Sequence, residues 1–153
     1  VVNRMDRDTM EAEFINRTGA QAVLNVVHGY AWGYDANDMA LLASVFDEDA
    51  ITGGVVNGTA LGWGPWKGQR AILEGLGEIR RTQTDRRRHQ LTTPVFLSLT
   101  DEEAILKVYL SIVSTLEGEK PRLLTTGHYL ATLHRSLGKW KIRKLDAELD
   151  DAF

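Results

Sequence analysis

The stretch VLNVVHGYAWGYDANDMALLASVF, residues 23–46, decides the fold that the rest of the chain has to complete. One face of a helix through this stretch would carry Val23, Val27, Tyr30 and Tyr34. Asp35 follows this face directly, and the Asp and Asn side chains after it favour a turn and a new helix start. We therefore predict a long amphipathic helix that ends near Asp35, then a short second helix. At this stage Asp35 is either a capping residue or part of a reactive site.

Two helix-start patterns precede this stretch. Asp8-Thr9-Met10-Glu11 has the form of a capping box, and a second start signal runs from Thr18 to Gln21. Two such signals close together predict a short lead-in helix within residues 1–17 and a main helix from about Gln21.

Glycine and tryptophan dominate the segment after the second helix. Residues 50–52 predict a brief strand, and GGVVNGTALGWGPWKG, residues 53–68, predicts a hairpin or mobile flap that carries Trp63 and Trp66. Pro65 is well placed to begin a third helix, whose apolar stripe ends near Arg81.

From His89 onward the hydrophobic period becomes two, which is the spacing of strands. The predicted strands cover residues 89–98, 104–115, 122–134 and 139–146, with Pro94 marking a bulge or a sheet edge. Their short connections predict an antiparallel meander, and a tail follows over residues 147–153. Helices first and a sheet afterwards indicate the α+β class, in which a curved sheet wraps over the helices and leaves a conical hollow between them.

The composition limits the class of protein. The chain has 153 residues, 43% of them hydrophobic, which is enough for one domain with a sizeable core. A net charge of -3 gives no reason to expect nucleic acid or a membrane as a partner, and the five arginines within residues 80–88 are interpreted as a solvated surface. No apolar run is long enough to span a bilayer. We expect a soluble, cytoplasmic homo-oligomer, a dimer or trimer, because exposed sheet surface is usually buried by self-association.

No metal and no cofactor are expected. The chain contains no cysteine, which excludes thiolate nucleophiles and zinc–thiolate sites. His128 and His134 share one face of their strand, but no third ligand accompanies them. Lys67 and Gly68 do not complete a phosphate-binding loop.

The order of elements resembles the nuclear-transport-factor-2-like superfamily, in its SnoaL-like branch. The most specific motifs are Tyr30-x-x-x-x-Asp35 followed by DMALLASVFDEDA, Trp66-Lys67-Gly68 opening the third helix, His89-x-x-x-Thr93-Pro94 on the first long strand, and Gly138-Lys139-Trp140 before the last. The resemblance covers residues 18 to about 149 and implies a cone-shaped α+β barrel.

The resemblance also implies a catalytic pair. In bile-acid dehydratases, scytalone dehydratases and hexachlorocyclohexane dehydrochlorinase, a helix-end Asp pairs with a first-strand His. Those positions match Asp35 and His89, and Tyr30 matches the dehydratases' phenol. His89 would then be the general base, Asp35 would orient its imidazole, and Tyr30 would donate a hydrogen bond or a proton. A further acidic residue of the bile-acid dehydratases falls at Ile112 here, so the leaving-group machinery differs.

We therefore expect a cofactor-independent lyase or isomerase of the dehydratase type that acts on a small hydrophobic molecule, for example a polycyclic or terpenoid-like one. The side chains expected to line its pocket are Trp63, Trp66, Phe96, Tyr109 and Ile112. One alternative is a non-catalytic ligand-binding or assembly module, such as a dioxygenase small subunit. The third is a limonene-type epoxide hydrolase, whose Arg-x-Asp pattern is missing from residues 104–115.

Overall fold

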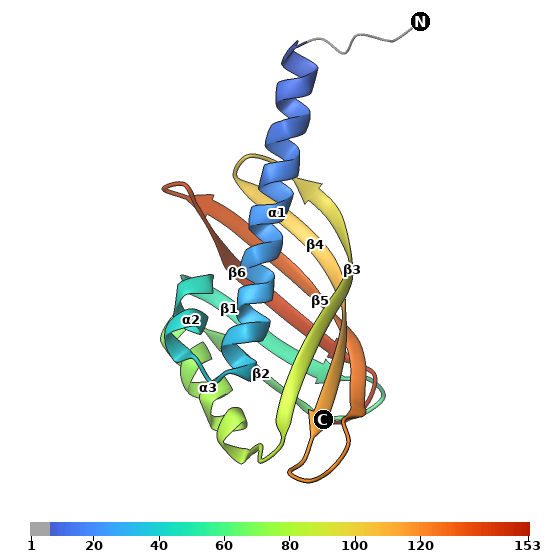
Figure 1. Cartoon of the computed structure of the whole chain (residues 1–153). Coiled ribbons are helices and arrows are strands. Elements are labelled where there is room, and N and C mark those ends of the chain that lie inside the picture. The colour runs from blue at the N-terminus through green and yellow to red at the C-terminus, as the bar shows by residue number, and fades with distance from the viewer. Residues whose placement is uncertain (1–6) are drawn as a thin grey trace, which may run out of the picture.

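The computed structural model describes residues 7–153, with side chains described from residue 19 onward. Within these residues, three helices and six strands follow in the order α1 (Arg7–Asp35), α2 (Met39–Val45), β1 (Phe46–Val56), β2 (Gly62–Lys67), α3 (Gln69–Thr82), β3 (Arg86–Leu99), β4 (Glu103–Thr115), β5 (Arg122–Ser136) and β6 (Lys139–Leu149). The strands form one curved sheet, and α1 crosses its concave face with α2 and α3 beside it (Figure 1). The α+β class is therefore confirmed.

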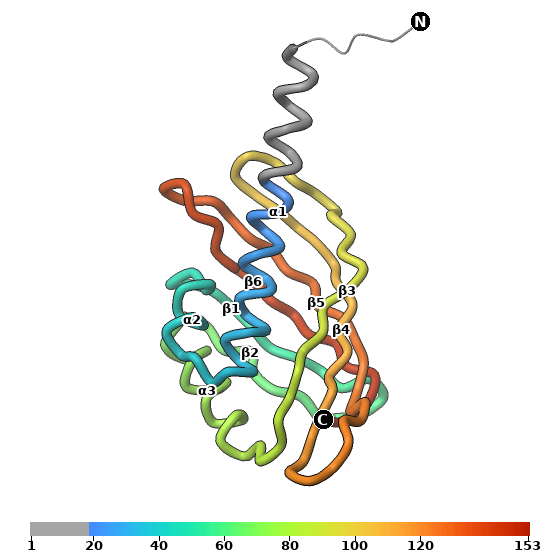
Figure 2. Tube along the Cα trace, viewed as in Figure 1, coloured from blue at the N-terminus to red at the C-terminus, as the bar shows by residue number. Residues whose placement is uncertain are grey.

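Helix α1 is continuous from Arg7 to Asp35, so the two start signals belong to one helix. The prediction of a separate lead-in helix is wrong from residue 7 on, and its first six residues lie outside the described part of the chain. The helix face read from the sequence, Val23, Val27, Tyr30 and Tyr34, is buried along its whole length. Figure 2 shows this described part of α1 descending across the sheet. No helix within residues 7–153 is both long and apolar enough to cross a membrane.

The sheet has the strand order β2-β1-β6-β5-β4-β3, so β2 and β3 are its edges and the sheet is open. The meander from β3 to β6 is antiparallel, as predicted, whereas β1 lies parallel to β6. Along β4, alternate residues from Ala104 to Ile112 are at most 2% exposed. These residues form the sheet side of the core that α1 covers.

The segment between α2 and α3 differs most from the sequence prediction. Strand β1 covers Phe46–Val56 instead of three residues, because β2 and β6 pair with it on both sides. Pro65 lies inside β2, and α3 begins only at Gln69. Proline is tolerated in β2 because an edge strand needs only half of its backbone hydrogen bonds. At the other end of the chain, β6 continues to Leu149, so the tail is shorter than predicted.

Pro94 marks both a bulge and an edge, as predicted. The register between β3 and β4 shifts between Thr92 and Val95, and Thr93 has a φ of 54°. After this shift Phe96 packs against the core. Strand β3 pairs with β4 on one side only, so its other edge is open to a side chain from α1.

Candidate active site

Asp35 is the last residue of α1, and it does not cap the next helix. The N-cap of α2 is Asp38, whose Oδ1 accepts the backbone N–H of Leu41 at 2.9 Å. At the C-terminal end of a helix, a carboxylate meets the negative pole of the helix dipole, which disfavours it by about 0.3–1 kcal/mol. A different interaction must therefore stabilise Asp35.

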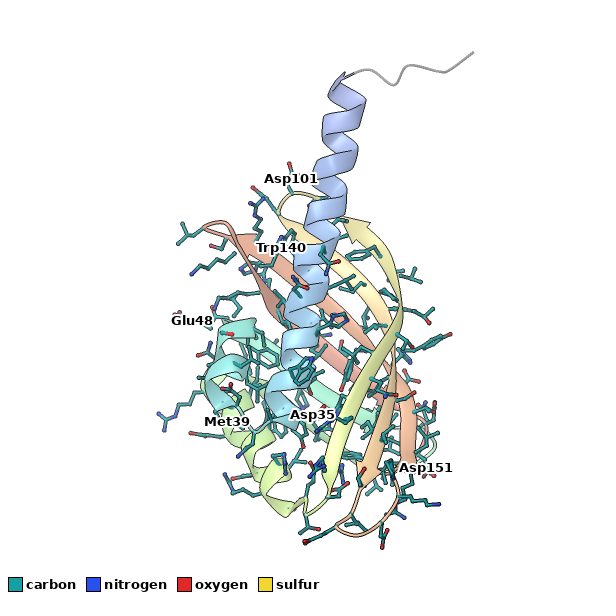
Figure 3. The ribbon with its side chains drawn as sticks, in the orientation of Figure 1. Asp35, Met39, Glu48, Asp101, Trp140 and Asp151 are labelled. Atoms are coloured by element: carbon teal, nitrogen blue, oxygen red, sulfur yellow. The ribbon has the colours of Figure 1, made fainter. Side chains whose placement is uncertain are left out.

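His89 of β3 supplies this interaction. Asp35 Oδ2 accepts the backbone N–H of His89 at 2.8 Å, and Asp35 Oδ1 lies 2.6 Å from the ring Nδ1 of His89. The side chains of Asp35 and His89 are only 9% and 7% exposed. The backbone N–H that Asp35 accepts lies on the open edge of β3, where no strand pairs with it. Figure 3 shows Asp35 at the end of α1, next to the strand that carries His89.

The contact with Asp35 sets the tautomer of the imidazole. A carboxylate only accepts hydrogen bonds, so Nδ1 of His89 carries the proton and Nε2 is the basic nitrogen. The ring of Tyr34 packs edge to face against the imidazole, with the ring centroids 5.2 Å apart. The Tyr34 hydroxyl donates to Gln83 Oε1 at 3.1 Å. The imidazole is therefore held by the carboxylate at one nitrogen and by an aromatic ring at its side.

Tyr30 lies about one helical turn before Tyr34 and is 5% exposed. Its ring meets the rings of Phe46 and Tyr129 edge to face. Burial raises the pKa of Tyr30 far above its ordinary value, the nearby Tyr34 adds to this, and a hydrogen bond with Tyr129 opposes it in part. Burial likewise raises the pKa of Tyr129. Both phenols therefore stay protonated at neutral pH, where they act as hydrogen-bond donors and not as bases.

A cavity of about 30 Å³ lies between this helix face and the sheet. The polar or ionisable side chains in its lining are Tyr30, Tyr34, Gln83, Arg87, His89 and Tyr129, and the rest of the lining is apolar or Trp63. Such a volume holds one or two water molecules, whereas ligand sites usually measure about 300–1,000 Å³. The expected conical hollow is present with a mainly apolar lining, and in this structure side chains nearly fill it.

The structure separates the five residues that were expected to line the pocket. Trp63 and Ile112 line the cavity. Trp66 lies instead against Gly75 of α3, and Phe96 packs on the core away from the cavity wall. Tyr109 is 62% exposed on the outer face of the sheet. Tyr109 and Ile112 are an odd number of positions apart on β4, so they point to opposite faces and cannot line one pocket.

Sequence reasoning missed Arg87, Tyr129 and Phe153, which also line the cavity. Arg87 lies two positions before His89 on β3, and the period of two places both on one face of the strand. That signal was present, but the arginines of this segment were interpreted together as solvated surface. Tyr129 belongs to the buried alternation of β5. Phe153 follows the last strand, where no periodic pattern indicates its position.

An open groove of about 670 Å³ lies on the other side of the pair. Asp35 and His89 both border this groove, together with Trp32, which is 70% exposed, and several arginines, whereas only His89 of the pair lines the small cavity. His89 therefore borders both a small, mainly apolar cavity and a larger groove that several charged side chains line. Among the side chains of residues 19–153, no group of three or more His, Asp or Glu is arranged to hold a metal ion.

Solved structures with the same architecture differ widely in sequence. A proposed scytalone dehydratase from Novosphingobium aromaticivorans has a TM-score of 0.71 at 20% identity, covering 90% of this chain and 87% of its own. The beta subunit of a proposed aromatic-ring-hydroxylating dioxygenase from the same organism has a TM-score of 0.75 at 13% identity, covering 90% and 92%. LinA has a TM-score of 0.74 at 17% identity, covering 90% of each chain. At these identities the likeness shows the fold alone.

The sequence itself carries a more specific signal. A search of curated proteins finds no match. The family model of the SnoaL-like domain, however, matches residues 18–146, which include the C-terminal part of α1, the pair and nearly the whole sheet. The chain therefore belongs to the SnoaL-like domain family.

Proposed function

We propose that the protein is a cofactor-independent lyase or isomerase in which His89 is the general base and Asp35 orients it. The observation that carries the proposal is the double contact of the Asp35 carboxylate with the N–H and the Nδ1 of His89. A carboxylate at this helix end is electrostatically unfavourable and serves no capping role. Its placement is therefore explained by what it does to the imidazole.

The chemistry follows from the groups around the pair. Nε2 of His89 takes a proton from a carbon next to an activating group, and Asp35 stabilises the imidazolium that forms. The protonated phenol of Tyr30, which lines the same cavity as His89, is a donor for a developing oxyanion or a leaving hydroxyl. Either loss of water or migration of a double bond completes such a reaction. No covalent intermediate is required.

The lining of the cavity favours a small hydrophobic substrate. Most of the apolar part of the lining consists of aliphatic side chains, namely Leu76, Ile79, Leu110, Ile112 and Leu149. A substrate with a six-membered ring needs more room than about 30 Å³, so side chains at the cavity must move when it binds.

The small cavity also favours a second candidate, a non-catalytic assembly or ligand-binding module. A filled interior suits a subunit whose task is assembly, and one solved structure of this fold is a dioxygenase beta subunit. In that case the Asp35–His89 contact would serve only to close the edge of β3.

Proton exchange separates these two candidates without knowledge of the natural substrate. The protein is incubated in D₂O with cyclohexanone, cyclohex-2-enone and 2-tetralone, and the loss of α-proton signals is followed by NMR. We expect exchange above the buffer rate for the unmodified protein and a loss of about 100-fold or more in Asp35→Asn and His89→Ala. His128→Ala is the matched control, because His128 lies on the outer face of the sheet and is not part of the cavity lining. Equal exchange in all four proteins, or none above buffer, contradicts the proposal.

We also propose that the protein is a homo-oligomer that buries the outer face of its sheet. Val95, Leu97 and Tyr109 are each more than half exposed on β3 and β4. Burying such apolar area stabilises an assembly by about 25 cal/mol per Å². Light scattering coupled to size exclusion should show a dimer or trimer, and Tyr109→Lys should shift it toward the monomer. A monomer at high concentration contradicts this proposal.

A further inference from the structure

Arg87 is the one Arg or Lys among the residues that line the small cavity. It lies on the same face of β3 as His89, so its guanidinium and the proposed base reach the same space. Its neighbours Arg86 and Arg88 are exposed, as the alternation of the strand requires. The side chain of Arg87 is only 12% exposed. A buried cation needs a specific partner, and the structure shows one.

Asp85 holds the guanidinium from one side. Nε of Arg87 donates to both carboxylate oxygens of Asp85 at 3.1 Å, and the hydroxyl of Ser114 donates to Asp85 from β4. Burial works against the charged carboxylate, but the hydrogen bonds from Ser114 and Arg87 outweigh it, so the pKa of Asp85 lies below its ordinary value. Ser114 is 2% exposed and anchors the arrangement in the core. The guanidinium therefore has a fixed orientation before any ligand binds.

The terminal nitrogens of Arg87 remain available. Both hydrogen bonds of its side chain start from Nε, and among the side chains described from residue 19 onward neither Nη has an acceptor. A guanidinium presents its two Nη groups as a fork that fits a charged or polarised oxygen. An oriented fork without an acceptor at a cavity wall is the arrangement expected of a ligand-binding group.

An aromatic ring covers this group. The ring centroid of Phe153 lies 5.7 Å from Cζ of Arg87, and the same ring meets Trp63 edge to face at 5.1 Å. Phe153 is 37% exposed and lies in the segment after β6. The Phe153 ring therefore occupies a position over the cation that the ring of a bound substrate can take instead.

We propose that Arg87 binds the carbonyl oxygen of the substrate and stabilises the negative charge that develops there, with the substrate ring displacing Phe153. This inference rests on the proposed function of His89 and defines its substrate class as cyclic carbonyl compounds. Nε2 of His89 takes the α-proton, the C–H electron pair forms the new C=C bond, and the carbonyl π pair moves to the oxygen held by Arg87. The oxygen pair then re-forms the C=O bond and the enol C=C pair moves toward the β-carbon. In a β,γ-unsaturated compound the γ-carbon takes the imidazolium proton, which moves the double bond into conjugation. In a β-hydroxy compound the C–O bond breaks with its electron pair, and the hydroxyl takes the imidazolium proton and leaves as water.

The spacing of the two residues suits this assignment. Positions two apart on one strand face lie about 7 Å from each other. Because both side chains project from one face of β3 at this spacing and line the same cavity, one small ligand can contact Arg87 and His89 together. Asp85 keeps the local charge of Arg87 balanced when the cavity is empty.

The test is the binding of 4-nitrophenolate, a stable mimic of an enolate, compared with nitrobenzene, which has the same ring without the charged oxygen. We expect the unmodified protein to bind 4-nitrophenolate at least tenfold more tightly than nitrobenzene by equilibrium dialysis. Arg87→Gln should abolish this preference, whereas Arg88→Gln, one residue along the strand and facing outward, should keep it within twofold. Phe153→Ala should bind 4-nitrophenolate more tightly, because no ring then competes for the cation.

Two results overturn the inference. One is an unchanged preference in Arg87→Gln, and the other is no preference for 4-nitrophenolate in both the unmodified protein and Phe153→Ala. If Arg87→Gln does not fold, Arg87→Lys replaces it, and a preference equal to that of the unmodified protein then counts against the inference. Because binding requires no proton transfer, this test and the exchange assay on His89 can fail independently of each other.

Discussion

Asp35→Asn is the most informative single substitution, because it preserves the shape of the side chain and removes only its charge. The carboxylate accepts two hydrogen bonds from His89, one from the backbone N–H and one from Nδ1. An amide offers one oxygen and one NH₂ group, so it cannot accept both. If its oxygen keeps the backbone N–H, its NH₂ faces Nδ1 and moves the ring proton to Nε2. The substitution therefore removes the base from the cavity without removing His89.

The effect on stability follows from the same two bonds. Hydrogen bonds to a charged group contribute about 1.5–3 kcal/mol each and neutral ones about 0.5–1.5, so two bonds lose about 2.5 kcal/mol together. Removing a negative charge from the C-terminal end of α1 returns about 0.5 kcal/mol. The free energy of unfolding should therefore fall by about 2 kcal/mol, which lowers Tm by about 4–8 °C for a chain of this size.

Urea denaturation and ¹⁵N NMR of the imidazole check this prediction together. The unmodified protein should show the proton of His89 on Nδ1, and Asp35→Asn should show it on Nε2. Asp38→Asn is the matched control, since Asn caps a helix as well as Asp and Asp38 makes no contact with His89. If Asp35→Asn were as stable as the unmodified protein and kept the same tautomer, the contact would not determine the state of His89.

Three further predictions concern stability. Gly75→Ala should lower the free energy of unfolding by about 1–3 kcal/mol, because the new Cβ would overlap the Trp66 ring. Gly77→Ala in the same helix has room for a Cβ and should raise the free energy of unfolding by up to about 1 kcal/mol. Urea denaturation measures both changes. Hydrogen bonds hold the pKa of Asp85 below its ordinary value, so its contribution to stability is present above about pH 4 and is lost as the pH falls through the lowered pKa. Asp85→Asn should remove this part of the acid sensitivity, which denaturation curves measured between about pH 5 and pH 3 would show. Burial raises the pKa of Tyr30, so this phenol ionises first in the unfolded chain, and the free energy of unfolding should fall as the pH rises above about 10. Between about pH 9 and pH 11, the free energy of unfolding of Tyr30→Phe should fall less than that of the unmodified protein.

The sequence predicted the elements whose residues follow one period without interruption. The helix face from Val23 to Tyr34 and the alternation along β4 are both buried as their spacing requires. Pro94 marked its bulge correctly, since proline removes a ladder donor wherever it stands in a strand. The segment around Pro65 was misread because its path depends on a neighbour far along the chain, β6, which pairs with β1 and extends it.

The residues of the site also differ in how far a local pattern predicts their positions. The period of two along β4 already places Tyr109 and Ile112 on opposite faces of the sheet, so the sequence was sufficient to exclude one of them from the pocket. The position of Phe153 over Arg87 could not have been foreseen, because it depends on how the segment after β6 returns to the sheet.

By itself, the sequence determined that one long helix would present two phenols and a carboxylate to a curved sheet, because helical and strand periods are local properties of the chain. The family resemblance implied the pairing of Asp35 with His89, but only the tertiary structure decided that the carboxylate would contact both the backbone N–H and the ring of His89 on the open edge of β3, and that the hollow beside them would be nearly full. Contacts between distant segments depend on packing, and packing density is set by all the side chains that meet in the core.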